Sequence, residues 1–130
     1  MSRKKAREIA FRYIYALGYG EGEFCDSESV SDGEAVEDEF IDKLCSVAKE
    51  NIDAIDAEIR LALKNFSFQR LVKVDLALLR MGIAEIIYML DTPSIVVIDS
   101  VVELAKKYST DKSPSFINGV LGTVAKKQGE

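Results

Sequence analysis

The sequence predicts an all-α fold, a bundle of six or seven helices. Apolar residues recur at helical spacing along nearly the whole chain, which is the main signal of amphipathic helices. The composition, 48% hydrophobic and 30% charged, is typical of a globular protein and argues against general disorder. A chain of 130 residues can form one domain, or two small subdomains that share a core.

The first predicted helix has an apolar stripe and a clear end. The stripe follows the i, i+3, i+4, i+7 pattern through Ala6, Ile9, Ala10, Tyr13, Ile14 and Leu17. The helix should end at the glycines that follow, Gly18, Gly20 and Gly22. From there to about residue 33 the chain is polar and acidic, which predicts a loop.

The middle of the chain predicts three more helices. The second runs from about residue 34 to 51, and the third follows a cap at Asp53 or Asp56. The stretch 65–73 is ambiguous and predicts at most a helical turn between two larger parts. Residues 74–90 are apolar nearly all round, as expected of a central helix.

Two helices are predicted in the last third, after a break at residues 91–93 that contains Pro93. Residues 95–98 could form a short strand, but the helical face that continues to Tyr108 favours a helix over 97–108. Ser113 and Pro114 then predict a capping residue followed by a first-turn proline. The last helix presents its apolar face through Phe116, Ile117, Val120, Leu121 and Val124.

The composition also limits the chemistry. The chain has no histidine, so the usual general base and the commonest zinc ligand are absent. Cys25 and Cys45 have no metal-binding or redox spacing, and we expect two unpaired thiols in a reducing compartment. No stretch resembles a secretory signal or a membrane span. We therefore expect a cytoplasmic protein without metal or cofactor. Catalysis by carboxylates or lysines remains possible in principle, although no spacing in the sequence indicates it.

The most informative feature is a basic cluster at the amino terminus of an acidic protein. The overall net charge is −5, yet the first twelve residues contain one acid and five bases: Arg3, Lys4, Lys5, Arg7 and Arg12. No further lysine or arginine occurs before Lys43. Because cations at a helix amino terminus oppose the helix dipole, stability alone would favour acids there. The pattern therefore indicates a local binding site for a polyanion.

Two aromatic residues, Phe11 and Tyr15, share the polar side of this helix with the cations. Aromatic faces stack on unpaired bases and cations bind phosphates, so the combination favours single-stranded RNA or DNA over a duplex. The alternative is that these rings pack on a neighbouring helix, and a membrane-surface role is a weaker option. Farther along the chain, the spacing of Glu103 and Lys107 predicts an exposed ion pair within one helix.

Five short motifs carry a resemblance that covers essentially the whole chain. They are Arg3-Lys-Lys-Ala-Arg7-Glu8, Val74-Asp75-Leu-Ala-Leu-Leu-Arg80-Met-Gly-Ile-Ala-Glu85, Pro93, Val102-Glu-Leu-Ala-Lys-Lys-Tyr108 and Phe116-Ile-Asn118-Gly-Val-Leu121. In this order and at these distances the chain resembles the NusB family of transcription antitermination factors. That family implies an all-helical fold of two small halves, here about 1–65 and 66–130, and no catalysis.

The resemblance also implies partners and site residues. Family members bind the boxA element of ribosomal RNA leader transcripts with the ribosomal protein NusE, and join elongating RNA polymerase with other Nus factors. By matching position, the residues implied in RNA binding are Arg3, Lys4, Lys5, Arg7, Tyr15, Phe116 and Asn118. Asp75 matches an acidic position that faces the ribosomal-protein partner.

Two other functions remain open at this point. One is a helical protein–protein adaptor whose basic end meets an acidic protein surface without direct RNA binding. The other is a helical accessory domain like that of some RNA methyltransferases, although no second domain is present to hold a cofactor.

Overall fold

The computed structural model describes residues 2–17, 38–64 and 66–129. Within these ranges the chain forms α-helices and one short 3-10 helix, and no strand, so the all-α prediction is confirmed. The elements are α1 (Arg3–Leu17), α2 (Asp38–Glu50), α3 (Ile52–Ala62), the 3-10 helix η3 (Phe68–Arg70), α4 (Lys73–Tyr88), α5 (Ser94–Tyr108) and α6 (Ser113–Lys127).

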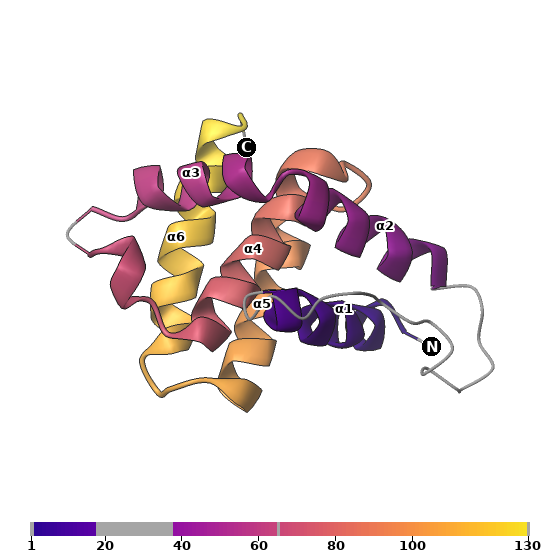
Figure 1. Ribbon diagram of the computed structural model, residues 1–130, viewed down its shortest axis with the longest axis horizontal. Coiled ribbons are helices and arrows are strands. Elements are labelled where there is room, and N and C mark those ends of the chain that lie inside the picture. Colours follow the sequence, from indigo (N-terminus) through magenta and orange to yellow (C-terminus); the bar gives the residue numbers. More distant parts are fainter. Residues whose placement is uncertain (1, 18–37, 65, 130) are drawn as a thin grey trace.

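Helix α4 lies at the centre of the fold, and each of the other α-helices packs against it (Figure 1). Its apolar side chains are buried on nearly every side, as its sequence predicts. Gly82 allows one of these contacts to be close, because a Cβ atom there would lie 2.9 Å from Leu121 Cδ1 of α6. The absence of a side chain at residue 82 therefore sets how near α6 approaches the central helix.

Helices from both parts of the chain contribute to one hydrophobic core. Ile14 of α1 and Leu44 of α2 are buried in the same cluster as Leu79 of α4 and Leu121 of α6. The division into halves near residue 65 stays a prediction. Cys45 is a buried thiol in α2. The predicted acidic loop, with Cys25, lies outside the described residues.

Several predicted helix starts are wrong. Helix α3 begins after Asn51, whose side-chain amide donates to the Val47 carbonyl, so neither Asp53 nor Asp56 is the cap. Helix α5 already begins at Ser94, and the strand alternative for 95–98 is wrong because these residues continue its first turns. The start of the second helix at residue 34 lies outside the described residues.

Helix α6 contains Pro114 in its first turn, as predicted, but Ser113 is not its cap. Ser113 is the first helical residue, and its hydroxyl donates to Asp75 Oδ2 of α4 over 3.0 Å. The Ser113 side chain therefore makes a tertiary hydrogen bond instead of the local cap that the sequence predicts. The ambiguous stretch 65–73 contains the predicted helical turn, which is η3.

Candidate nucleic-acid interface

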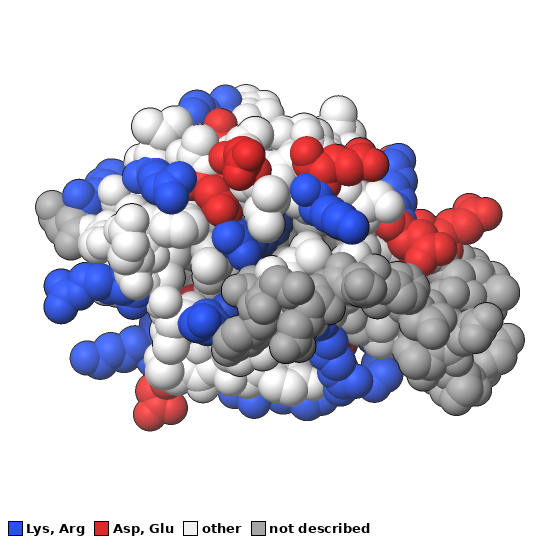
Figure 2. All heavy atoms as spheres, viewed as in Figure 1, with Lys and Arg blue, Asp and Glu red and all other residues white. Residues whose placement is uncertain are grey.

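The amino-terminal turn of α1 carries three exposed cationic side chains, Arg3, Lys4 and Lys5, which we call the basic face. Arg3 also lies over the Phe40 ring of α2, with its guanidinium carbon 4.1 Å from the ring centroid. Figure 2 shows lysine and arginine side chains along the lower edge of the view, below α1. Over α2 and α3, in the upper half of the view, acidic side chains lie among further lysine and arginine side chains.

Arg7 differs from its basic neighbours because it points into the protein. Its side chain is 3% exposed, and it donates from Nε and Nη2 to the two carboxylate oxygens of Glu85 over 2.7 and 2.6 Å. A third bond runs from Nη1 to Ser100 Oγ over 3.1 Å. The guanidinium therefore ties α1 to α4 and α5. A role of Arg7 in RNA binding stays a prediction, and its location gives it a structural role first.

Glu8, the next residue, ties the same helix to the end of α5. It is buried and accepts hydrogen bonds from Lys107 Nζ over 2.7 Å and from the Tyr108 hydroxyl. The cations of Lys5 and Arg12 lie 3.8 Å from its carboxylate. The hydrogen bond from Lys107 and then that from Tyr108 lower the pKa of Glu8, so the carboxylate is ionised at neutral pH.

The lysines of α5 were not recognised in the sequence as part of this surface. The predicted Glu103–Lys107 pair is wrong: Lys107 binds Glu8, and Glu103 pairs with Lys106 over 3.3 Å. Glu8 and Lys107 are 99 residues apart, so helical spacing could not indicate their contact. The one local signal was the pair of adjacent lysines in the last turn of the predicted helix.

The two aromatic rings on the predicted polar side of α1 differ in burial, and a role of Tyr15 in base stacking stays a prediction. Phe11 is buried, with its ring centroid 5.2 Å from that of Tyr108 and 6.2 Å from that of Tyr15. Its availability for base stacking is therefore a wrong prediction, and the alternative of packing on a neighbouring helix is correct for this residue. Tyr15 is half-buried.

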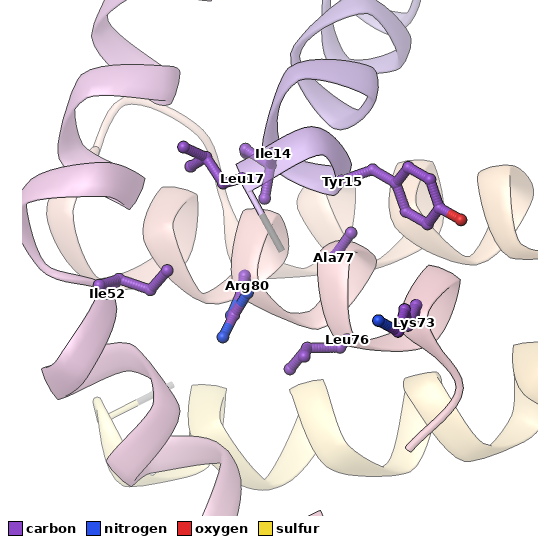
Figure 3. A pocket seen from close by; sticks show the side chains of 8 residues that line it. All are labelled: Ile14, Tyr15, Leu17, Ile52, Lys73, Leu76, Ala77 and Arg80. Atoms are coloured by element: carbon purple, nitrogen blue, oxygen red, sulfur yellow. The ribbon is translucent and has the colours of Figure 1, made fainter. Parts of the chain in front are cut away.

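Tyr15 lines a groove of about 210 Å³ between α1, the start of α3 and the first half of α4. In Figure 3 its ring extends along the α4 side of the groove, next to Ala77 and above Lys73. Arg80 lies at the other end, and its guanidinium donates two 2.8 Å hydrogen bonds to Asp56. The groove thus combines an aromatic ring with the cation of Lys73, while the charge of Arg80 is balanced by Asp56. Aromatic rings next to cations are typical of sites that bind single-stranded nucleic acids.

The remaining predicted site residues lie around the first turns of α4 and α6. Asn118 is exposed, and the ring of half-buried Phe116 lies 5.5 Å from that of Phe66. Asp75 is buried and accepts hydrogen bonds from the hydroxyls of Ser109 (2.6 Å) and Ser113 (3.0 Å). Its partner-binding role stays a prediction.

Asp75 and Phe116 line one mainly apolar groove of about 360 Å³. Its rim includes the exposed apolar side chains Phe66 and Val72. The structure thus places most of the predicted site residues along α1, and Asp75 and Phe116 at this groove, whereas Asn118 is exposed on α6 and does not line it. The second region suits a protein partner better than a phosphate, because apolar side chains dominate it.

The described part of the chain gives no sign of a metal site or a membrane span. No group of three or more acidic, cysteine or histidine side chains is placed there to hold a metal ion. None of the described helices combines the length and the apolar character needed to cross a bilayer.

Comparisons with known proteins agree on one family. The NusB family model matches residues 4–126. The transcription antitermination protein NusB of Clostridium novyi is 36% identical over 132 residues, which cover 97% of this chain and 99% of the relative. That of Geobacter sulfurreducens is 38% identical over 129 residues, covering 95% of this chain and 94% of the relative.

Solved structures agree with these relatives. A solved structure of T. maritima NusB is 30% identical and superimposes with a TM-score of 0.87, covering 98% of this chain and 92% of the other. A structure of the antitermination factors NusB and NusE in complex with double-stranded RNA is 32% identical, with a TM-score of 0.85 and 96% of each chain covered.

Proposed function

The chain belongs to the NusB family, and we propose that it is a transcription antitermination factor that binds boxA-type single-stranded RNA together with the ribosomal protein NusE. In this role it joins elongating RNA polymerase with other Nus factors, in the cytoplasm, and supports ribosomal RNA transcription. Its relatives carry the name transcription antitermination protein, and one similar structure contains NusE and RNA. The protein acts by binding and performs no catalysis.

The observation that carries the proposal is the exposed basic face on a protein of net charge −5. Arg3, Lys4 and Lys5 contact RNA phosphates, and the acidic remainder of the sequence discourages other polyanions from binding elsewhere. Tyr15 stacks on an unpaired base at the groove that it lines.

A positioning role for Arg7 follows from its burial, since its guanidinium holds the helix that carries the basic face. Phe116 and Asn118 provide further RNA contacts on α6. Phe116 also lines the apolar groove, so we place the NusE contact on the other part of that groove, around Asp75 and Val72.

The test is fluorescence anisotropy of a short boxA-like RNA against a scrambled strand and a duplex, with and without NusE. We expect preferential binding to the single boxA-like strand, strengthened by NusE. If three cations contact phosphates, the logarithm of the affinity should fall with that of the salt concentration at a slope of about −2. Equal or absent RNA binding, with NusE still captured, would instead leave the adaptor function.

The partner groove can be tested separately with Val72→Asp. Val72 is half-exposed and occupies the N-cap position of α4, where no side chain now caps the helix. Aspartate is a favourable cap, so the variant should fold at least as well as the parent. It places a charge in an apolar docking surface, and we expect NusE capture to fall while binding of RNA alone persists. Unchanged NusE capture would remove this groove from the interface.

A further inference from the structure

A groove between α1 and the last two turns of α5 has no function assigned to it by the proposed RNA and NusE contacts. It has a volume of about 390 Å³ and is lined by Lys4, Glu8, Glu103, Leu104, Lys106 and Lys107. Lys4 belongs to the basic face, so the groove continues that face from α1 onto α5. We call it the α1–α5 groove.

The charge in and beside this groove is mostly positive. Five cations surround it, namely Lys4, Lys5, Arg12, Lys106 and Lys107, against the two carboxylates of Glu8 and Glu103. The side chains of Lys106 and Lys107 are each 59% exposed, whereas Glu8 is buried beneath them. A ligand in the groove would therefore meet ammonium groups before it met the Glu8 carboxylate.

Glu8 holds the cations in place. Its carboxylate accepts a hydrogen bond from Lys107, and the charges of Lys5 and Arg12 lie on either side of it. Arg12 in turn donates to the Tyr108 hydroxyl over 3.2 Å, which fixes the end of α5 against α1. The buried Glu8 carboxylate thus reduces the repulsion between the neighbouring cations. The cations still outnumber the carboxylates, so the groove can attract an anionic ligand.

We propose that the α1–α5 groove is a second phosphate-binding site, in which Lys106 and Lys107 contact the backbone of the single-stranded RNA that the basic face of α1 binds. The proposal rests on the proposed RNA-binding function and extends the RNA path onto α5. A phosphodiester backbone fits better than an acidic protein, because of the described lining residues only Leu104 is apolar, and it is buried. Protein interfaces usually centre on apolar or aromatic anchors, whereas phosphate contacts need only well-placed cations.

The first test replaces both lysines of α5 in the full chain, as Lys106→Gln/Lys107→Gln. The matched control is Lys126→Gln/Lys127→Gln, which makes the same charge change in the last turn of α6, outside the groove. Loss of two phosphate contacts should reduce the salt slope by about 1.4 and weaken binding about 25-fold at 0.1 M salt. Because phosphate contacts carry no sequence information, boxA-like and scrambled strands should lose affinity by a similar factor.

The second test is a variant expected to gain affinity, which a folding defect would not produce. Glu103 is half-exposed and competes with RNA for Lys106, so Glu103→Gln should tighten RNA binding about fivefold at 0.1 M salt. Binding equal to the parent in both the lysine variant and Glu103→Gln would overturn the proposal. So would a lysine variant that loses NusE capture but keeps RNA affinity, because the groove would then be a protein-docking surface. A parent protein that binds no RNA would refute the proposed function itself.

Discussion

The buried pair of Arg7 and Glu85 allows a quantitative test of what the basic amino terminus does. The two side chains are 3% and 1% exposed, and their two hydrogen bonds are 2.6 and 2.7 Å long. Arg7→Met would leave the Glu85 carboxylate buried without its counter-ion. Removing one partner of such a pair costs about 3–5 kcal/mol, so we expect the free energy of unfolding to fall by this amount. By contrast, loss of the exposed Lys106–Glu103 pair should cost less than about 1 kcal/mol.

The assay is a double-mutant cycle measured by urea unfolding. It compares the parent with Arg7→Met, Glu85→Met and the double variant, and uses Lys106→Met as the exposed control. The double variant should recover much of the loss, because apolar side chains replace a pair that is costly to desolvate. If Arg7→Met changed the stability by less than about 1 kcal/mol, the reasoning from burial would be refuted.

The same double variant separates the structural role of Arg7 from an RNA contact. When it is folded, its α1 still presents Arg3, Lys4 and Lys5. A positioning role predicts that it binds the boxA-like strand with nearly the parent's affinity and salt slope. A slope less steep by about 0.7 in the folded double variant would mean that Arg7 itself neutralises a phosphate.

Three further predictions concern packing and charge. Gly82→Ala should destabilise the protein by about 1–3 kcal/mol in thermal melting, because its new Cβ atom would lie 2.9 Å from Leu121 Cδ1. As a control, Gly122→Ala should stabilise α6 by up to about 1 kcal/mol, because a Cβ atom there would meet no atom within 4 Å. Folding lowers the pKa of Glu8 below its ordinary value of 4.5. The parent should therefore be more stable than Glu8→Gln by its full margin above pH 4.5, and this margin should shrink as the pH falls through the pKa of Glu8 in the folded protein. An advantage that does not change with pH would contradict this. Asp75→Ala should cost about 1–3 kcal/mol in urea unfolding, because it removes the buried carboxylate that accepts a hydrogen bond from each of two serine hydroxyls, and an unchanged midpoint would contradict it.

The sequence predicted the helices well because each buries a stripe of apolar side chains, and that periodicity is local. The sequence-based prediction failed at helix starts, where a polar side chain can bond either to its own helix or to a residue distant in the sequence. Ser113 shows the difference: as a cap it would bond to its own helix, but its hydroxyl bonds to Asp75, 38 residues away. Asn51 bonds back into the preceding helix instead of capping α3 with its side chain. Such choices depend on tertiary contacts that no local pattern contains.

The sequence predicted where the candidate site lies but not which of its cations are exposed and which are buried in ion pairs. Glu85 was an informative residue, since a carboxylate on the apolar part of the central helix needs a buried hydrogen-bond donor or cation. The sequence offers several cations, and its partner Arg7 is 78 residues away. Charge pattern alone therefore grouped Arg7 with the exposed cations. Likewise, Phe11 lies on the polar side of α1 when this helix is considered alone, but its ring packs on Tyr108 of α5 and is buried in the folded protein.

Glu8 explains how one helix can be anchored and remain a cationic surface. Arg7 and Glu8 are adjacent, and they tie α1 to α4 and α5 with opposite charges. Residues three and four apart share a helix face, so Lys4, Lys5 and Arg12 all lie on the same side of α1 as Glu8. The carboxylate that fastens α1 to Lys107 therefore also determines where these cations gather. Because the basic surface is built around a buried anion, Glu8→Gln should loosen the α1–α5 groove even though it raises the net positive charge there.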